Sequence, residues 1–223
     1  MKKILMAFFV FLVALNIQAQ DQTQLKKDSI ISDDLLQDAT AQYKKDSVKL
    51  LPDKYIFTQK ILWGPKGLMR NFNTFKLSNE ERERELKIRR VMLISHQILG
   101  FVTLGGMIGQ GIVGSLLYNS HLRDPDNDKY LPAHLFLAHF VNTCYFTTAG
   151  LALLAPPKMI NERKGYGSIK LHKALAIVHF TSMVAVNVLS WELEAHPALV
   201  PYHRAAAITA FSSFALGMIV LKF

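Results

Sequence analysis

Eight histidines stand out in this sequence, because all of them follow Arg90, in the part of the chain that is poorest in charge. Six lie in long apolar stretches or in their first turn: His96, His134, His139, His172, His179 and His203. An ionisable side chain inside a membrane helix is costly and usually faces a bundle interior with a partner. The chemistry that a buried neutral imidazole does best is metal binding, and iron in haem is the metal that suits a dry apolar bundle. The remaining two, His121 and His196, fall in polar loops, where a solvated histidine is ordinary.

Four apolar stretches of membrane length must position these histidines. They cover residues 91–117, 131–157, 174–191 and 205–221, and only 15 of the 43 charged residues follow residue 90. About 20 helical residues cross the hydrocarbon core, and a soluble domain would need charge over its whole surface. We therefore predict an all-α membrane protein whose residues 78–223 form a four-helix transmembrane bundle. Its spans are expected at about 90–118, 131–156, 169–191 and 202–222.

The direction of the helices decides which histidines can meet. Short loops make neighbouring helices antiparallel, so the second and fourth helices run the same way, as do the first and third. His134 and His203 each follow a proline at a helix start by two residues and are expected at one level, near one membrane face. His96 is expected to meet His172 or His179 near the opposite face.

The second and third helices each carry two histidines, which leaves the ligand there open. His172 and His179 are seven residues apart and share a helix face, whereas His134 and His139 are five apart, about 140° around the helix. The spacing is compatible with two bis-histidine sites for one or two b-type haems. The expected ligands of the haem iron are His96, His172, His134 and His203, with His139 and His179 as second choices.

Three sequence fragments around these histidines resemble a known family. They are Ser95-His96-Gln97-Ile98-Leu99-Gly100, Leu171-His172-Lys173-Ala174-Leu175-Ala176 and Tyr202-His203-Arg204-Ala205-Ala206. With one histidine in each of four consecutive helices, the chain resembles the diheme transmembrane cytochromes of the cytochrome b-561 class. The resemblance implies two b-type haems and electron transfer across a membrane, between a donor such as ascorbate or quinol and an acceptor on the other side. The chain departs from that family in its second histidines at His139 and His179.

Cations at the helix ends are placed to meet haem propionates in such a protein: Arg90, Lys170, Lys173 and Arg204. Interfacial snorkelling of these long side chains is the other explanation. Whether the protein is an enzyme, as a transmembrane oxidoreductase, or an electron carrier stays open, and no catalytic residue is assigned.

Two other functions remain to be weighed against a cytochrome. In a non-catalytic membrane scaffold or partner subunit, the histidines would be interhelical hydrogen-bonding groups. A proton or metal-ion transporter is less favoured, because the spans hold no Asp or Glu to alternate with histidine. Hydrolytic chemistry is not supported, since no nucleophile motif, phosphate loop or H-E-x-x-H is present.

The N-terminal third is polar and reads as an exported region. Residues 1–19 are expected to form a signal peptide, with Lys2 and Lys3 before an apolar run, and an uncleaved membrane anchor is the alternative. Residues 20–53 are expected to form a polar tether. Residues 54–77 are basic, aromatic and free of acid, which indicates either an amphipathic segment at the membrane interface or one packed on the end of the bundle.

A capping box at Ser78 and Glu81 marks the start of the helix that continues into the first span. The charged stem of that helix is expected to be solvated and to carry ion pairs four residues apart. The expected pairs are Glu80–Arg84, Glu83–Lys87 and Glu85–Arg89.

These features predict a multi-pass protein of a bacterial inner membrane with a periplasmic N-terminal region. One observation opposes that orientation: it leaves 11 basic flanking residues outside and three inside, against the positive-inside tendency. The expected partners are the lipid bilayer and a quinol or a periplasmic electron donor or acceptor, with a homodimer left open. Nucleic acid is excluded as a partner, because the net charge of +9 is spread along the chain without a dense basic face.

Overall fold

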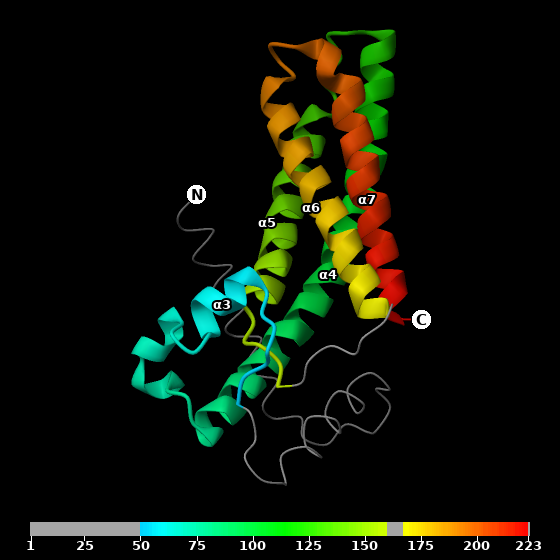
Figure 1. The fold of residues 1–223 in the computed structure, drawn as a ribbon. Coiled ribbons are helices and arrows are strands. Elements are labelled where there is room, and N and C mark those ends of the chain that lie inside the picture. The colour runs from blue at the N-terminus through cyan, green and yellow to red at the C-terminus, as the bar shows by residue number, and fades with distance from the viewer. Residues whose placement is uncertain (1–49, 160–166, 223) are drawn as a thin grey trace, which may run out of the picture. The chain divides into compact units, whose positions relative to one another are not determined.

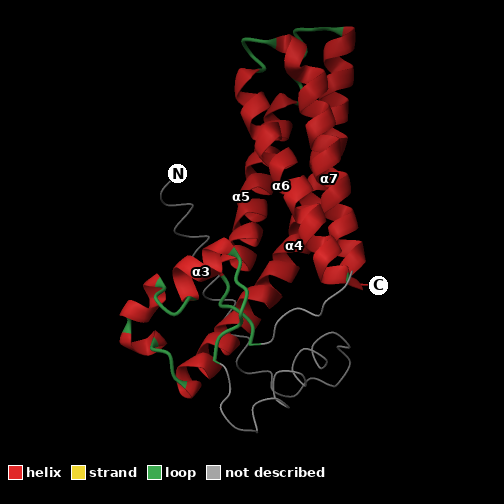
Figure 2. Cartoon of the chain, viewed as in Figure 1, coloured by secondary structure: helices red, strands yellow, loops and turns green. Residues whose placement is uncertain are grey.

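The computed structural model describes residues 50–159 and 167–222, and helices are the only regular elements in those ranges (Figures 1 and 2). In chain order they are α3 (Phe57–Trp63), η2 (Leu68–Asn71), η3 (Asn73–Phe75), α4 (Asn79–Arg123), α5 (Leu131–Leu154), α6 (Ser168–Glu192), η4 (Pro197–Leu199) and α7 (Val200–Lys222). The predicted signal peptide, and the predicted tether up to residue 49, lie outside the described residues.

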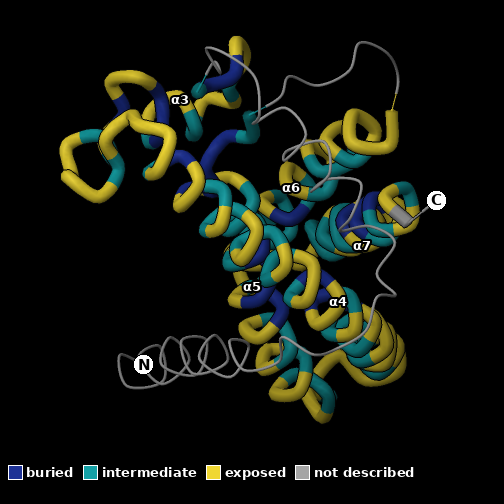
Figure 3. Tube along the Cα trace, turned by 90° about the horizontal axis from the view of Figure 1, so that it is seen from below, coloured by how far each residue is buried: buried dark blue, intermediate teal, exposed yellow. Residues whose placement is uncertain are grey.

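Four helices are long and apolar enough to cross a membrane: α4, α5, α6 and the continuous stretch Pro197–Leu221 that contains α7. The predicted all-α architecture with four membrane-length helices is confirmed. Their outward faces carry exposed residues all round the bundle (Figure 3). Many of these residues are large and apolar, such as Phe136 at 71% and Ile177 at 67% exposure. Apolar exposure on this scale suits hydrocarbon rather than water.

The bundle consists of two helical hairpins. Helix α4 packs along α5 and α6 along α7, and both hairpin turns lie at the same end of the bundle (Figure 1). Between the hairpins only α4 and α7 come close, while the Cα atoms of α4 and α6, and those of α5 and α7, stay more than 8 Å apart. Side chains of all four helices form a common core: Met107, Val141, Tyr145, Met183, Ala210 and Phe214. The diagonal pairs α4–α6 and α5–α7 are therefore joined through side chains, without close packing of their backbones.

The ends of α4 and α5 follow from local sequence. Ser78 caps α4 by accepting a hydrogen bond from the Glu81 backbone N–H at 3.2 Å, so the predicted capping position is confirmed. From there α4 runs unbroken for 45 residues, as the sequence predicts. Helix α5 ends before Pro156 and Pro157, because proline disfavours the helical conformation of the residue before it and cannot continue the helix.

The segment between residues 54 and 77 packs on the C-terminal end of α5. Three of its side chains donate to successive carbonyls: Thr58 Oγ1 to Leu153 (2.6 Å), Trp63 Nε1 to Leu154 (2.9 Å) and Gln59 Nε2 to Ala155 (3.1 Å). The last carbonyls of a helix have no partner within it, so these bonds satisfy groups that would otherwise be orphaned. The same segment exposes Phe57 at 78% and Phe72 at 59%. Packing on the bundle is thus observed, and a location at the membrane interface stays a prediction.

The expectation of a fully solvated stem is wrong for one face of α4. Arg82 and Glu85 are buried, with 1% and 0% exposure, because the preceding segment contacts them through Arg70 and the Leu50 carbonyl. Glu85 forms ion pairs with Arg70 and Arg82. A carboxylate between two guanidinium groups replaces the predicted solvated surface.

The ion pairs expected along the stem form only in part. Glu83 and Lys87 pair at 3.1 Å on the exposed face, as predicted. The predictions of Glu80–Arg84 and Glu85–Arg89 pairs are wrong, because different partners lie closer to the two arginines. Arg84 takes Glu81 at 3.5 Å in place of Glu80, and Arg89 donates to the Pro156 carbonyl at 2.6 Å in place of pairing with Glu85.

Candidate functional site

His96 of α4 and His172 of α6 bring their imidazole rings close together across the two hairpins. Their ring centroids are 6.4 Å apart and the ring planes stand at 87°. The two helices do not bring their Cα atoms within 8 Å of each other, so the imidazoles extend toward each other across an open helix pair. The pairing is one of the two that the helix directions predict for His96.

Each ring of this pair is held by the other helix of its own hairpin. His96 Nδ1 lies 2.9 Å from the Thr148 carbonyl of α5, and His172 Nδ1 lies 2.8 Å from the Gly217 carbonyl of α7. A carbonyl oxygen only accepts hydrogen bonds, so both Nδ1 atoms carry the proton and both Nε2 atoms keep a free lone pair. Hydrogen bonding of one ring nitrogen to a carbonyl is the usual way in which proteins orient a metal-binding imidazole.

His134 of α5 and His203 of α7 are the other two first-choice histidines. They are close enough for a charge on one to affect the other. His203 Nδ1 donates to the Val186 carbonyl of α6 at 3.1 Å, again within its own hairpin. The Gln110 amide of α4 lies beside His134, with Nε2 3.3 Å from each ring nitrogen. All four first-choice histidines therefore have a polar contact within their own hairpin, and a ring contact across the hairpins joins His96 to His172.

The two pairs lie at different depths in the bundle. On α5, Thr148 beside His96 and His134 itself are 14 residues apart, and on α7 Gly217 and His203 are also 14 apart. At 1.5 Å per residue, each interval is about 21 Å along the helix axis. The common core, which includes Met107 and Phe214, contains residues of all four helices.

The second-choice histidines lie in other surroundings. His139 is exposed on α5. His179 Nδ1 is 2.6 Å from the Tyr145 hydroxyl, and its ring centroid is 5.2 Å from that of Phe214. His179 is thus hydrogen-bonded inside the core, although His96 and His172 are within electrostatic range.

The loop histidines pair with nearby carboxylates. His121 Nε2 is 3.1 Å from Asp128 Oδ1, and the exposed His196 is 3.8 Å from Glu192. In the described residues no group of three or more His, Cys, Asp or Glu side chains is placed to hold a metal ion.

The cations predicted to meet propionates differ in their surroundings. Arg204 stacks over the Tyr118 ring, with its guanidinium carbon 3.7 Å from the centroid, which links α7 to α4. Arg90, Lys170 and Lys173 have exposed side chains at the other end of the bundle. Contact of these cations with propionates remains a prediction.

Amides in the spans make polar contacts between helices that were not predicted from the sequence. Asn142 and Asn187 join α5 to α6 by two reciprocal hydrogen bonds, of 2.7 and 3.0 Å. Gln110 lies against His134. A polar amide in an otherwise apolar span is itself a signal, because such groups need a partner in hydrocarbon. Asn142, Asn187 and Gln110 can therefore be recognised in the sequence as polar residues within apolar spans.

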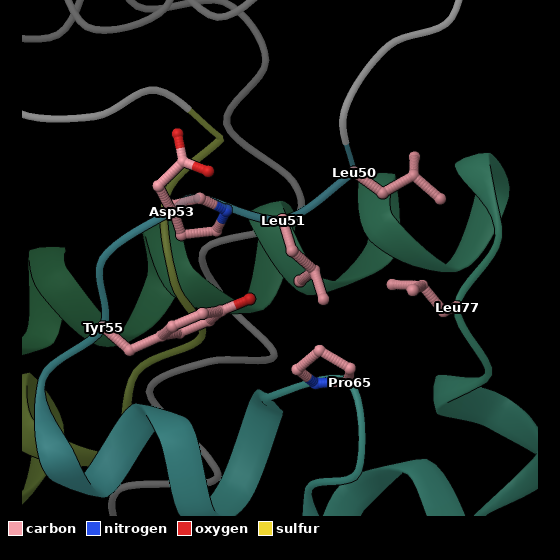
Figure 4. Close-up of a pocket in the computed structure, with 7 residues that line it drawn as sticks. Leu50, Leu51, Asp53, Tyr55, Pro65 and Leu77 are labelled. Carbon is pink, nitrogen blue, oxygen red and sulfur yellow. The ribbon is translucent and has the colours of Figure 1, made fainter.

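A shallow pocket of about 460 Å³ lies away from the histidines. It is lined by Leu50, Leu51, Pro52, Asp53, Tyr55, Pro65 and Leu77, in the segment before α4 and at its margin (Figure 4). The lining is mostly apolar and holds no histidine. The histidine pairs, rather than this pocket, are therefore the candidate functional site.

The fold and these contacts define the class of protein. Four apolar helices of membrane length, with polar contacts directed inward and large apolar residues directed outward, make the chain a multi-pass helical membrane protein. No protein family model, curated protein or solved structure matches the chain. Its function is accordingly argued from the geometry of the histidines.

Proposed function

We propose that this protein is a membrane b-type cytochrome that carries electrons across or along the membrane. One haem would be held by His96 and His172 and a second by His134 and His203. The observation that carries the proposal is the ring contact of His96 and His172 across the hairpins, together with Nδ1 atoms of three histidines bonded to a backbone carbonyl of the same hairpin. The resemblance of the surrounding fragments to the cytochrome b-561 class supports the same function.

The spacing of the first pair fits a bis-histidine haem. Two metal–imidazole bonds of about 2 Å place opposed ring centroids roughly 6 Å apart. The His96 and His172 centroids are 6.4 Å apart. A flat macrocycle between them also needs separated backbones, and the Cα atoms of α4 and α6 stay more than 8 Å apart. Both distances would allow His96 and His172, one from each hairpin, to hold a haem between them.

The residues of this chain then have definite tasks. The paired histidines would offer a ring nitrogen to the iron, the carbonyls would fix the orientation of the His96, His172 and His203 rings, and the apolar core would keep water away from the path between the sites. Haem, when bound, supplies reversible one-electron oxidation and reduction of its iron. Sites about 21 Å apart along the axis cover most of a hydrocarbon core of about 30 Å. This depth favours transfer from one face to the other, with a quinol or a periplasmic reductant as the donor.

Counting haem in the purified full-length protein tests the proposal. A reduced-minus-oxidised spectrum is expected to show b-type bands, and a pyridine haemochrome assay is expected to give two haems per chain. One haem per chain would restrict the function to one of the two pairs. Protein that is folded and monodisperse in detergent but free of haem would contradict the proposal and favour a non-catalytic scaffold with structural histidines.

The proposed location is a bacterial inner membrane with the N-terminal region in the periplasm. An even number of spans returns the C-terminus to the side of the N-terminal region, so a reporter fused after Phe223 is expected to be active outside the cytoplasm. Fusions of a phosphatase and of a fluorescent protein provide the two opposed readouts. Cytoplasmic activity would reverse the orientation, in line with the excess of basic residues on the flanks that lie on the same side as Phe223.

A further inference from the structure

The outer face of α3 is apolar and basic, whereas its inner face is fixed to the bundle. Side chains of the inner face donate to the last carbonyls of the α5 segment: Thr58, Gln59 and Trp63. At 3.6 residues per turn, Phe57, Lys60 and Ile61 share the opposite side of the helix. Phe57 is 78% exposed, Ile61 is 44% exposed, and Lys60 is exposed beside them. Helix α3 thus turns two large apolar side chains and a cation away from the bundle.

Helix α3 lies at the level where the hydrocarbon of a membrane ends. The 24 residues of α5, at 1.5 Å each, make about 36 Å, against about 30 Å for a hydrocarbon core. The last residues of α5, to which α3 is bonded, therefore reach the boundary between hydrocarbon and headgroups. Figures 1 and 3 show α3 at the side of the bundle, beyond α5. A segment in that place meets lipid rather than the end of the bundle.

The charge of the segment matches an anionic surface. Residues 54–77 contain no acid. Four of their lysines are exposed: Lys54, Lys60, Lys66 and Lys76. Among the described residues none of these four pairs with a carboxylate, whereas Arg70 is turned inward to Glu85. Lysines close to a layer of anionic headgroups are attracted to it, and their stems can lie along apolar surface.

Exposed apolar side chains continue beyond α3. Leu68, Phe72 and Leu77 are exposed, and Lys66 and Lys76 lie among them in the sequence. Large apolar residues mixed with lysines are typical of segments that lie in the plane of a membrane interface, with the apolar side chains in the boundary region. In water the same residues would form an unfavourable exposed patch.

From these observations we propose that the segment before α4 is a lipid anchor, which binds the headgroups of anionic phospholipids. Phe57 and Ile61 enter the boundary between headgroups and acyl chains, and the lysines contact the headgroup phosphates. The hydrogen bonds to the end of α5 hold the anchor at a fixed place beside the bundle. This inference does not rest on the proposed function.

Fluorescence quenching of the full-length protein in nanodiscs tests the anchor. An environment-sensitive label is attached at Phe57→Cys, in a Cys144→Ala background so that the new thiol is the only one. The matched control carries the label at Glu80→Cys, which is exposed on the stem of α4, about 16 Å along the helix before Val91. Nitroxide-labelled acyl chains quench from the membrane, and iodide quenches from water. The nanodiscs contain phosphatidylcholine alone or mixed with phosphatidylglycerol.

The label at Phe57→Cys is expected to respond to anionic lipid. Its quenching by acyl chains should be at least about twofold stronger with phosphatidylglycerol than without it, and its quenching by iodide weaker. The label at Glu80→Cys should be quenched by iodide in both lipids. Changing Lys54, Lys60 and Lys66 together to Gln should return the Phe57→Cys label to its behaviour in neutral lipid.

Three results would overturn the proposal. Strong quenching by iodide in both lipids would show that Phe57 faces water. Weak quenching by both agents would show that protein, such as a second copy of the chain, covers this face. Equal quenching by acyl chains in neutral and anionic nanodiscs, or no effect of the three lysine changes, would exclude recognition of anionic headgroups.

Discussion

Replacing His172 by alanine is expected to abolish the low-spin bis-histidine signal of one haem and to leave the other intact. His96→Ala should remove the same signal, because the centroids of the two rings are 6.4 Å apart. His134→Ala and His203→Ala should both remove the remaining one. The measurement is the reduced-minus-oxidised spectrum of each purified variant, together with haem per chain.

Double variants give the decisive test of which histidines share a haem. His96→Ala combined with His172→Ala should equal either single change, whereas His96→Ala with His203→Ala should abolish both signals. His139→Ala is the matched control, because this histidine is exposed on α5, and it should keep both haems. Additive loss within a pair, or loss of haem in the control, would contradict the assignment of ligands.

His179→Ala addresses the remaining alternative in the third helix. The ring is hydrogen-bonded to Tyr145 at 2.6 Å in the core, so both bis-histidine signals should persist while the bundle loses a buried polar contact. Loss of the His96 signal in this variant would instead make His179 the ligand.

Much of the pairing could be predicted from sequence, because helix direction and residue depth are properties of the chain alone. The separation of about 140° between His134 and His139 already required that one of them point outward. For His172 and His179 the sequence could not decide, since both occupy one helix face. The contact of His179 with Tyr145 depends on how α5 packs beside α6, which periodicity does not reveal.

The region before α4 was harder to predict for a different reason. Arg82 and Glu85 have the spacing of ordinary surface residues on a helix. Their burial depends on Arg70 and on a carbonyl at Leu50, which is 32 residues distant from Arg82 along the chain. Local propensity carries no information about such a contact. The side-chain bonds to the last carbonyls of α5 are equally non-local.

The Arg70–Glu85–Arg82 cluster leads to the second large expected effect. Glu85 is fully buried between two guanidinium groups, and Arg82 also donates to the Leu50 and Pro157 carbonyls at 2.8 and 2.9 Å. Removing one partner of a buried ion pair leaves uncompensated charge and typically costs about 3–5 kcal/mol. Glu85→Ala is therefore expected to release the segment before α4 from the bundle. Limited proteolysis between residues 50 and 78 and thermal unfolding in detergent measure the change.

The position of this cluster predicts which haem site fails first when Glu85 is replaced. The cluster and its neighbours hold the end of α5, through the Pro157 carbonyl and the bonds at Leu153 and Leu154. Thr148, whose carbonyl orients His96, lies less than two turns earlier on α5. On heating, Glu85→Ala should lose the haem of His96 and His172 before that of His134 and His203, about 21 Å away.

A matched substitution on the same helix separates this effect from a general loss of charge. Glu83 is 58% exposed and pairs with Lys87 at 3.1 Å, so Glu83→Ala should change stability by no more than about 0.5 kcal/mol. Equal stability of the two variants would show that the buried cluster does not anchor α5. Simultaneous loss of both haems in Glu85→Ala would place its effect on the whole bundle. Loss of the first haem alone would tie the segment before α4 to the ligand geometry of the nearer site.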